Sequence, residues 1–310
     1  MTKTNNHVAV LGIFAADLTF RAERMPKPGE TLPGSGFALS LGGKGSNQAI
    51  AAARAGADVT FISRIGQDAF GDNALAAWAA DGVTARVVRS QSEPTGAAFI
   101  FVDQATGENA IIVYPGAALL LSPDDVEMAR AAIEAASVFV TQLEQPVPAA
   151  RRGLEIARAA GTTTIFNPAP FVPFDPAIYG LSDYMTPNET EAAAMTGIVI
   201  RTLDDARAAG DVLLERGVGT ALITLGEKGA LLHSKGLSEV VPAFSAGPVV
   251  ETTGAGDAFN AGFAAALARG VPPLDAARFG SATAGLSVTR AGAAPSMPKL
   301  AEIMTLLGAQ

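Results

Sequence analysis

The feature that most constrains the fold of this chain is an alternation between short β-type runs and longer alanine-rich helical runs. Strand-like runs lie at residues 8–13, 59–65, 138–142, 163–167, 184–186 and 221–225. Helix-like runs are interspersed with them, at residues 46–55, 68–80, 123–135, 148–160 and 203–216. Because strands that alternate with helices usually pair in parallel, the sequence predicts an α/β fold with one doubly wound, mostly parallel sheet. Ligands of such sheets bind at the carboxyl ends of the strands.

Two regions depart from this alternation. Residues 26–41 are rich in Gly and Pro, and residues 96–114 contain two β-type runs around a polar turn, which indicates a hairpin. Neither region has enough apolar residues for a core of its own. We therefore expect a single domain over residues 1–310, in which about 14–41 and 95–115 form a small β-sheet lid over the main sheet. A lid of this kind keeps water away from a reacting phosphate.

Composition excludes several classes of protein. The chain has no cysteine, which excludes disulfides and thiolate metal sites, and the polar N-terminus lacks the pattern of a secretory signal. Its two histidines, His7 and His233, are expected to be structural or exposed, so a general base must be Asp, Glu or Lys. The net charge of −8 argues against a nucleic-acid partner, and no apolar run is long enough to span a bilayer. We expect a cytoplasmic protein that binds small molecules.

The run that points most directly to chemistry lies at residues 253–257 and reads Thr-Gly-Ala-Gly-Asp, at the expected start of a helix. Free N–H groups at a helix N-terminus bind anions, and glycines let a phosphate approach them closely. A carboxylate in the same turn, Asp257, can accept the proton of an attacking hydroxyl while the amides stabilise the developing charge. The run therefore predicts phosphoryl transfer. Its alternative is a glycine cluster that only tightens a strand-to-helix connection.

A second glycine-rich run, at residues 42–45, reads Gly-Gly-Lys-Gly and precedes a helix-like stretch. Its glycines let the backbone approach a ligand, while Lys44 and Asn47 can meet hydroxyls or phosphate. The run is not a Walker A loop, because Ala38 stands where that motif needs glycine and Gly45 follows the lysine. A tight strand-to-helix turn is the alternative interpretation.

Three further segments follow strand-like runs and so belong at the same edge of the sheet. Asn188 and Glu191 could hold water-coordinated Mg²⁺, or they could form a helix-capping arrangement. Gly226 and Gly229 lie in a turn between two strand-like runs, for which a hairpin is the alternative to a ligand loop. Asp17 follows the first strand and is either a ligand-binding residue or a turn former.

Taken together, these runs resemble the ribokinase family of carbohydrate kinases, the PfkB-type sugar and nucleoside kinases, over nearly the whole chain. Residues 42–47 are similar to the first family signature and residues 253–257 to the second. The segments 188–191 and 224–226 are similar to the Mg·ATP elements of the family. Within the family, the chain looks most like the ribokinases proper.

The resemblance implies ATP-dependent phosphorylation of the primary 5-hydroxyl of a pentose, with D-ribose as the first expectation. Asp257 would be the base, and the amides of Ala255, Gly256 and Asp257 would be the anion hole. Gly254, at the start of the same turn, is the remaining catalytic position implied. The implied sugar-binding residues are Asp17, Gly42, Gly43, Lys44, Asn47, Glu144 and Asp257. The implied nucleotide-binding residues are Asn188, Thr224, Gly226, Gly229, Gly256 and Ser281.

The resemblance also implies cofactors and a partner. Asn188 and Glu191 would lie near Mg²⁺. A monovalent cation, K⁺, would be held beside the anion hole by Glu251, Thr253, Ser287, Arg290, Gly292 and Ser296. A homodimer joined through the lids is the assembly that the family suggests.

Three positions depart from the family pattern. Ala15 stands where ribokinases usually have Asn, so one contact to a sugar hydroxyl is missing. Glu251 replaces the usual Asp of the cation site, which leaves K⁺ activation open. Ser281 replaces the histidine that lies at the adenine edge in some ribokinases. A site without a donor tolerates a substrate without the matching hydroxyl, so 2-deoxyribose or a nucleoside is the alternative substrate.

Two alternatives belong to other classes. The chain could be a sugar-binding regulator that keeps the fold without catalysis, although the intact Asp257 argues against that interpretation. A nicotinamide-dependent oxidoreductase would share the sheet architecture, but the first strand lacks the G-x-G-x-x-G fingerprint.

Overall fold

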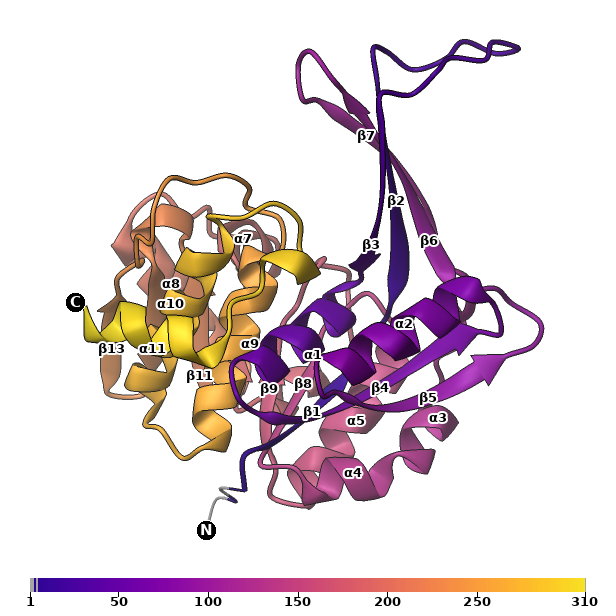
Figure 1. The fold of residues 1–310 in the computed structure, drawn as a ribbon. Helices are drawn as coiled ribbons and strands as arrows, with labels where there is room; N and C mark the ends of the chain where they lie inside the picture. Colours follow the sequence, from indigo (N-terminus) through magenta and orange to yellow (C-terminus); the bar gives the residue numbers. More distant parts are fainter. Residues whose placement is uncertain (1–2, 4, 310) are drawn as a thin grey trace.

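A computed structural model describes residues 3 and 5–309 and contains one large and one small sheet (Figure 1). The large sheet has nine strands in the order β13-β12-β11-β10-β9-β8-β1-β4-β5. Neighbouring strands from β11 to β5 run parallel, and β12 and β13 are antiparallel additions at one edge. The strand bounds are β1 (His7–Leu11), β4 (Asp58–Gly66), β5 (Thr84–Ser90), β8 (Val138–Thr141), β9 (Thr163–Phe166), β10 (Tyr184–Met185), β11 (Thr220–Thr224), β12 (Ala230–Ser234) and β13 (Leu237–Val241). The expected doubly wound, mostly parallel sheet is confirmed.

Helices cover both faces of this sheet, because its central strands are apolar on both sides. In β1, Val8 and Val10 face one core, whereas Ala9 and Leu11 face the other. The first core is covered by α1 (Lys44–Arg54), α2 (Ala69–Ala80), α9 (Ala255–Ala268), α10 (Pro273–Ser287) and α11 (Leu300–Gly308). The second core is covered by α3 (Pro123–Met128), α4 (Arg130–Ala135), α5 (Val147–Ala159), α6 (Ala177–Leu181), α7 (Glu189–Thr196) and α8 (Leu203–Glu215).

The helix expected over residues 123–135 is in fact two short helices, α3 and α4. At Ala129 the backbone turns to φ −97° and ψ 5°, and its N–H bonds to the carbonyl of Val126, three residues back. This tighter bond interrupts the four-residue spacing of an α-helix. Short 3₁₀ turns occur elsewhere, as η1 (Gly116–Leu120), η2 (Gly226–Lys228) and η3 (Ala294–Ser296).

The small sheet has four strands in the order β3-β2-β6-β7 and rises away from the helical layers (Figure 1). Its bounds are β2 (Ala15–Ala22), β3 (Gly36–Gly42), β6 (Gly96–Asp103) and β7 (Asn109–Tyr114). β6 and β7 form the expected hairpin, and β2 pairs in parallel with β6. Side chains on one face of the sheet are apolar, and because alternate residues point to opposite faces, Asp17 belongs to the other face. We call this apolar face the outer face; it contains Leu18, Phe20, Phe37, Leu39, Phe99 and Ile112.

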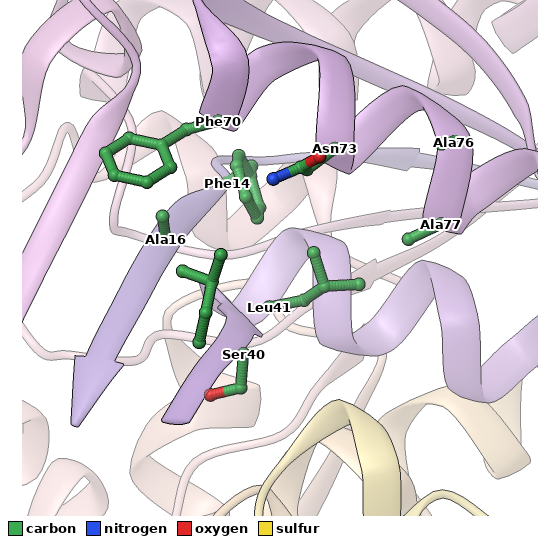
Figure 2. Close-up of a pocket in the computed structure, with 9 residues that line it drawn as sticks. Phe14, Ala16, Ser40, Leu41, Phe70, Asn73, Ala76 and Ala77 are labelled. Atoms are coloured by element: carbon green, nitrogen blue, oxygen red, sulfur yellow. The ribbon is translucent and has the colours of Figure 1, made fainter. Parts of the chain in front are cut away.

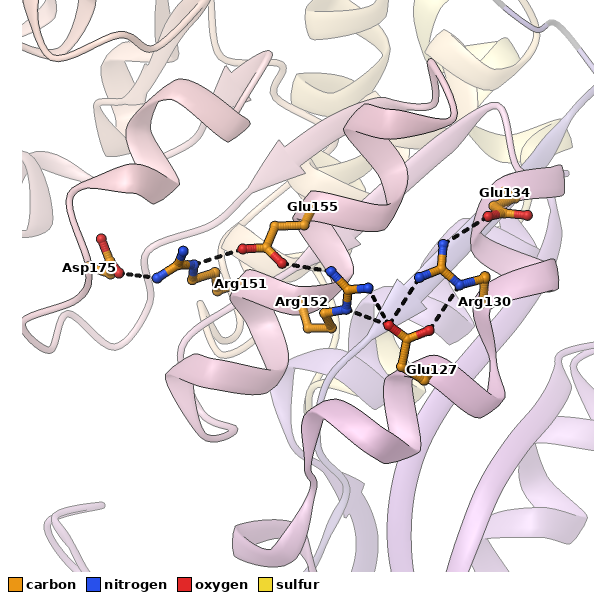
Figure 3. A network of polar contacts seen from close by, with 7 residues as sticks. All are labelled: Glu127, Arg130, Glu134, Arg151, Arg152, Glu155 and Asp175. Carbon is orange, nitrogen blue, oxygen red and sulfur yellow. Dashed lines mark hydrogen bonds and ion pairs between the residues drawn. The ribbon is translucent and has the colours of Figure 1, made fainter.

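Ion pairs link the surface of α3, α4 and α5 to the segment before α6 (Figure 3). The network consists of Glu127, Arg130, Glu134, Arg151, Arg152, Glu155 and Asp175. These side chains are between about a third and a half exposed, so each pair contributes little to stability. Within the described residues, no helix is both long and apolar enough to cross a membrane.

Candidate active site

The polar runs of the sequence converge at the carboxyl ends of the central strands. The backbone N–H of Lys44, in α1, donates to Glu144 Oε2 at 2.7 Å, and Glu144 lies just after β8. The side-chain amide of Asn47, also in α1, donates to Asp257 Oδ2 of α9 at 3.1 Å. These two contacts join three segments that are far apart in the sequence. The edge of the sheet expected to bind ligand is therefore where the signature residues meet.

A pair of glycines lets the start of α1 lie against the end of β1. A Cβ built on Gly12 would lie 2.7 Å from the Cα of Gly45, and one built on Gly45 would lie 2.6 Å from the Cα of Gly12. Gly43 has φ +84°, a conformation that glycine adopts without strain. The tight strand-to-helix turn weighed above is therefore present, and it is also what brings Lys44 and Asn47 to the site.

Asp17 lies at the base of the small sheet, next to the main sheet. It is paired with β3, and a Cβ on Gly42 would lie 2.4 Å from both of its carboxylate oxygens. Burial raises the pKa of Asp17 to about 6. The small residue at position 42 thus lets the Asp17 carboxylate lie directly over the end of β3.

Two residues beside Asp17 differ in what they face. Ala15 shares the face of β2 that carries Asp17, and only its methyl group is available there. Phe14 instead packs edge-on against Trp78 of α2, with ring centroids 5.5 Å apart. Figure 2 shows Phe14 with Leu41 and Phe70 around a cavity of about 390 Å³ between the small sheet and α2. None of the residues in the polar cluster lines that cavity.

Asp257 lies in the first turn of α9 and is 5% exposed. The helix begins after Gly254, whose φ of +78° turns the chain into it. Ala255 donates its N–H to the carbonyl of Thr252 at 3.1 Å. The N–H groups of Gly256 and Asp257 have no acceptor among the described residues, and the space beside Gly256 is open. Of the three amides expected in the anion hole, those of Gly256 and Asp257 are therefore free of a protein acceptor within the described residues, whereas that of Ala255 is not.

Burial sets the charge balance of this cluster. It raises the pKa of Asp257, while the charge of Lys44 and hydrogen bonds from Gln48 and Asn47 act in the opposite direction. Burial also raises the pKa of Glu144 to about 7, against the effect of the Lys44 N–H. For Lys44, burial lowers the pKa, but nearby carboxylates, first that of Asp257, raise it above its ordinary value. The cluster thus combines one cation with several carboxylate acceptors, which suits an uncharged ligand rich in hydroxyl donors.

Asn188 and Glu191 form a complete capping box at the start of α7. The N–H of Asn188 donates to Glu191 Oε2 at 2.8 Å, and the N–H of Glu191 donates to Asn188 Oδ1 at 2.8 Å. The second carboxylate oxygen of Glu191 makes no hydrogen bond within the described part of the chain. No cluster of three or more acidic or His side chains suited to a metal occurs in that part. Such a sparse donor set fits Mg²⁺, which keeps several waters and needs few protein oxygens.

The nucleotide residues expected at the next strand end have unequal surroundings. Thr224 ends β11, and its N–H bonds to the carbonyl of Pro187, beside Asn188. Gly226 is exposed, with open space where a Cβ would be. At Gly229 a Cβ would lie 2.0 Å from the carbonyl oxygen of Val241. Only glycine therefore lets the start of β12 lie this close to the end of β13. The hairpin alternative is correct as a description of this segment, and it leaves Gly226 accessible.

Ser281 lies in α10 and is 5% exposed. Its hydroxyl donates to the carbonyl of Pro242 at 2.7 Å, which ties α10 to the segment after β13. The side chain therefore already has a protein acceptor.

The segments implied for a monovalent cation lie side by side. The N–H of Glu251 bonds to the carbonyl of Val288 at 3.2 Å, and the Glu251 carboxylate accepts the N–H of Gly292 at 2.8 Å. The Glu251 carboxylate thus joins its own segment to the loop that contains Gly292. Thr253, also expected there, is exposed. Arg290 is partly buried and pairs with Glu302. Ser287 and Ser296 are buried, and their hydroxyls donate to backbone carbonyls.

Sequence reasoning missed a group of buried amide side chains behind Asp257. Gln48 donates to Asp257 Oδ1 at 3.0 Å, and Gln142 donates to Gln48 Oε1 at 2.6 Å. Asn167, in the segment after β9, lies 3.2 Å from Gln48 Nε2. The signal that could have revealed Gln48 is a polar residue that follows Asn47 in an otherwise alanine-rich helix.

The expectation for the histidines fits their contacts, since His233 bonds to Ser238 and Asp211 on the far edge of the sheet.

Comparison with known proteins matches residues 5–300 to the pfkB family of carbohydrate kinases. The ribokinase of Haemophilus influenzae is 39% identical over 301 residues, which cover 97% of this chain and 98% of that protein. The deoxyribokinase of Salmonella typhi is 35% identical over 295 residues, which cover 94% of this chain and 96% of that protein.

The fold of this chain is also similar to that of a solved member of the family. The ribokinase of Arabidopsis thaliana, complexed with ribose and ATP, is similar with a TM-score of 0.90 and 33% identity, covering 97% of this chain and 98% of that chain. Family, relatives and solved structure agree with the resemblance carried by residues 42–47 and 253–257. This chain belongs to the pfkB family of carbohydrate kinases.

Proposed function

We propose that this protein is an ATP-dependent sugar kinase that transfers the γ-phosphoryl group to the 5-hydroxyl of a pentose, with D-ribose as the expected substrate. The observation that carries the proposal is the buried Asp257 beside the free N–H groups of Gly256 and Asp257. A base and an anion-binding position in one helical turn are what transfer to an alcohol requires. Relatives named as ribokinases, one of them solved with ribose and ATP, support the substrate pair.

In the proposed reaction, the sugar 5-hydroxyl loses its proton to the Asp257 carboxylate as its oxygen attacks the γ-phosphorus. The new O–P bond forms while the bond from phosphorus to the β,γ-bridging oxygen breaks, and ADP leaves. The amides of Gly256 and Asp257 stabilise the charge on the transferring group. Because Asp257 is held in place, positioning and electrostatics supply most of the rate enhancement.

Sugar binding is proposed for the polar cluster at the end of β1 and β8. Asn47 Oδ1 is buried and has no protein partner within the described residues, so a sugar hydroxyl can donate to it. Asp17 and Glu144 supply further acceptors, and the Lys44 ammonium supplies donors. Gly42 and Gly43 let the backbone lie close to the sugar.

Nucleotide and ion binding are proposed for the more exposed strand ends. Thr224 and Gly226 would line the nucleotide, and Asn188 with Glu191 would hold Mg²⁺ through the free Glu191 oxygen and water. When bound, Mg²⁺ neutralises charge on the phosphates. The loops of Glu251 and Gly292 would hold K⁺ largely through backbone oxygens. Gly229 and Ser281 would act by shaping the surrounding backbone.

The main alternative substrate is 2-deoxyribose. Ala15 favours it, because this position presents only a methyl group on the face of β2 that carries Asp17. A pocket without a donor at that position leaves no buried group unpaired when the substrate lacks the matching hydroxyl. The similarity to a deoxyribokinase is consistent with this alternative. A nucleoside substrate would be distinguished in the same assay.

We also propose that the small sheet acts as the lid and that two chains associate through its outer face. Phe37, Leu39 and Ile112 are 60%, 45% and 67% exposed on that face, and large exposed apolar patches mark interaction sites. The molar mass measured by light scattering tests the proposed homodimer. A mass equal to that of a single chain at micromolar concentration would contradict it. The cytoplasmic location expected from the sequence stays a prediction.

The proposed function is tested by ADP formation with D-ribose, 2-deoxyribose, other pentoses and nucleosides. We expect ADP formation that depends on added pentose and on Mg²⁺, and the ratio of kcat/KM values selects the substrate. ATP and sugar binding without turnover would instead support a non-catalytic sugar-binding regulator.

A further inference from the structure

Both carboxylate oxygens of Asp257 are hydrogen-bonded by consecutive residues of α1. Asn47 Nδ2 donates to Oδ2 at 3.1 Å, and Gln48 Nε2 donates to Oδ1 at 3.0 Å. A carboxylate has about four acceptor positions, so these bonds leave one position on each oxygen for other donors. Asn47 faces the proposed sugar position, but Gln48 lies behind the base and is only 1% exposed.

Gln48 is itself held in one orientation. The Asp257 carboxylate can only accept, so Gln48 must present its NH₂ group to it and turn its carbonyl oxygen away. That oxygen accepts the side-chain amide of Gln142, which is fully buried, at 2.6 Å. The hydrogen-bond chain therefore runs in one direction, from Gln142 through Gln48 to Asp257.

Asn167 accepts a second hydrogen bond from the Gln48 side-chain amide. Asn167 donates to the carbonyl of Thr186 at 2.9 Å, and this carbonyl can only accept. The Asn167 carbonyl oxygen is thereby turned to Gln48 Nε2, at 3.2 Å. Both protons of the Gln48 amide thus have a buried acceptor, Asp257 on one side and Asn167 on the other.

We propose that Gln48 and Gln142 are positioning residues for the general base, which hold the Asp257 carboxylate in the rotation that presents a free oxygen position to the substrate hydroxyl. The inference rests on the proposed kinase activity. Neither amide titrates, so the relay does not carry the proton; the proton moves from the substrate oxygen to Asp257. Hydrogen bonds to an ionised carboxylate also favour its charged form, which is the form that acts as the base.

The charged groups around Asp257 come from other positions and stay unchanged when the relay is altered. Lys44 faces Asp257 from α1, and the carboxylates of Glu144 and Glu191 face it from the segment after β8 and from α7. Replacing Gln48 or Gln142 by Met changes no charge and keeps an unbranched side chain of similar length. A change in the pH dependence of these variants therefore reports on the hydrogen bonds alone.

The test compares Gln48→Met and Gln142→Met with the wild type in steady-state kinetics across pH. For Gln48→Met we expect kcat to fall about 10-fold to 100-fold, because a hydrogen bond to a charged group is lost. The sugar KM should change by less than about 3-fold, since Gln48 does not face the sugar. The acid limb of the kcat profile should move to higher pH, because loss of the donor disfavours the ionised base. Gln142→Met should give the same pattern with a smaller loss, about 3-fold to 10-fold.

Gln145→Met is the matched control. Gln145 is also buried, and it donates to Thr141 Oγ1 at 2.8 Å and to the backbone carbonyl of Gln142 at 2.6 Å. It makes no hydrogen bond to the side chains of Gln48, Gln142 or Asp257, so its replacement leaves the side-chain relay in place. Its kcat and pH profile should match those of the wild type, and thermal unfolding confirms that each variant is folded. If Gln48→Met does not fold, Gln142→Met carries the test alone.

The relay and the proposed function are overturned by different results. An active wild type whose folded relay variants keep kcat within 2-fold and an unmoved acid limb overturns the relay alone. A rise in KM at constant kcat also overturns it, because it assigns these residues to sugar binding. A wild type without sugar-dependent ADP formation overturns the proposed function and the relay together.

Discussion

The two ends of the candidate site are built in different ways. At the sugar end, Asn47, Gln48 and Asp257 are at most 5% exposed and bond to one another across more than 200 residues of sequence. At the proposed nucleotide end, Asn188 and Gly226 are exposed, whereas Glu191 is 9% exposed. Local backbone turns and a capping box supply the structure there. Buried polar groups are costly to leave unpaired, whereas exposed ones can turn to water. Substitutions should therefore have larger effects at the sugar end than at the nucleotide end.

The largest effect is expected from Asp257→Asn, which removes the base at the buried end. The amide keeps the size of the side chain but cannot accept a proton at neutral pH, so kcat should fall about 10²-fold or more. Calorimetric titration should show ATP and sugar binding largely intact. Near-normal turnover would remove Asp257 from the role of base.

The cost of burying charge at the sugar end can be measured through Glu144→Gln. Burial raises the pKa of Glu144 from 4.5 to about 7 in the folded protein, so between these values the unfolded chain has released a proton that the folded chain retains. The contribution of Glu144 to the free energy of unfolding of the wild type is therefore fully present below pH 4.5 and is lost as the pH rises toward 7. The variant lacks this loss, and its stability relative to the wild type should increase by up to about 3 kcal/mol across that window.

Denaturant unfolding of the ligand-free protein at several pH values measures this difference. Glu155→Gln, on the surface network of Figure 3, is the control, and it should show no comparable increase. A Glu144→Gln difference that is flat with pH would show that the carboxylate titrates normally.

The nucleotide end is tested by Glu191→Gln, for which a smaller effect is expected. The amide can still accept the N–H of Asn188 and cap α7, but it is a weaker ligand for Mg²⁺. The Mg²⁺ concentration for half-maximal activity should rise about 10-fold, with unfolding stability little changed. Glu189→Gln in the same helical turn, which takes no part in the capping box, should not shift the Mg²⁺ titration. An unshifted titration for Glu191→Gln would place the metal elsewhere.

The smallest effect concerns specificity at the buried end. Ala15→Asn adds a donor and an acceptor on the face of β2 that carries Asp17. The ratio of kcat/KM for D-ribose to that for 2-deoxyribose should rise about 3-fold to 10-fold, the value of one hydrogen bond. Competition between the two sugars in one reaction measures the ratio directly. A ratio that falls or stays constant would mean that position 15 does not face the distinguishing hydroxyl.

The sequence allowed much of the fold to be predicted, because its strong signals are local. Alternating apolar and alanine-rich runs predict the sheet and its helices, and glycine-rich turns at strand ends predict where ligands bind. The break at Ala129 was missed because it depends on one backbone turn inside a helix-like run. The antiparallel edge strand β13 was missed because its short, half-exposed sequence resembles a surface loop.

Contacts within the site were predictable only in part. The signature residues around Lys44 and Asp257 carry recognisable local patterns, so their joint role could be proposed from the family resemblance. The pairing of Gln48 with Asp257, 209 residues away, leaves no local pattern and needs three-dimensional coordinates. The same holds for Ala255, whose N–H looks available in the sequence but is used by Thr252 in the turn.

We propose above all that Asp257 and the first turn of α9 direct phosphoryl transfer to the primary hydroxyl of a pentose. The most direct test is ³¹P–¹H correlation NMR of the product formed from ATP and D-ribose or 2-deoxyribose, with the wild type and with Asp257→Asn. We expect a 5-phosphate with ADP in equal amount from the wild type, and about 10²-fold slower formation with the variant. A phosphate on any other carbon, or equal rates for the two proteins, would contradict it.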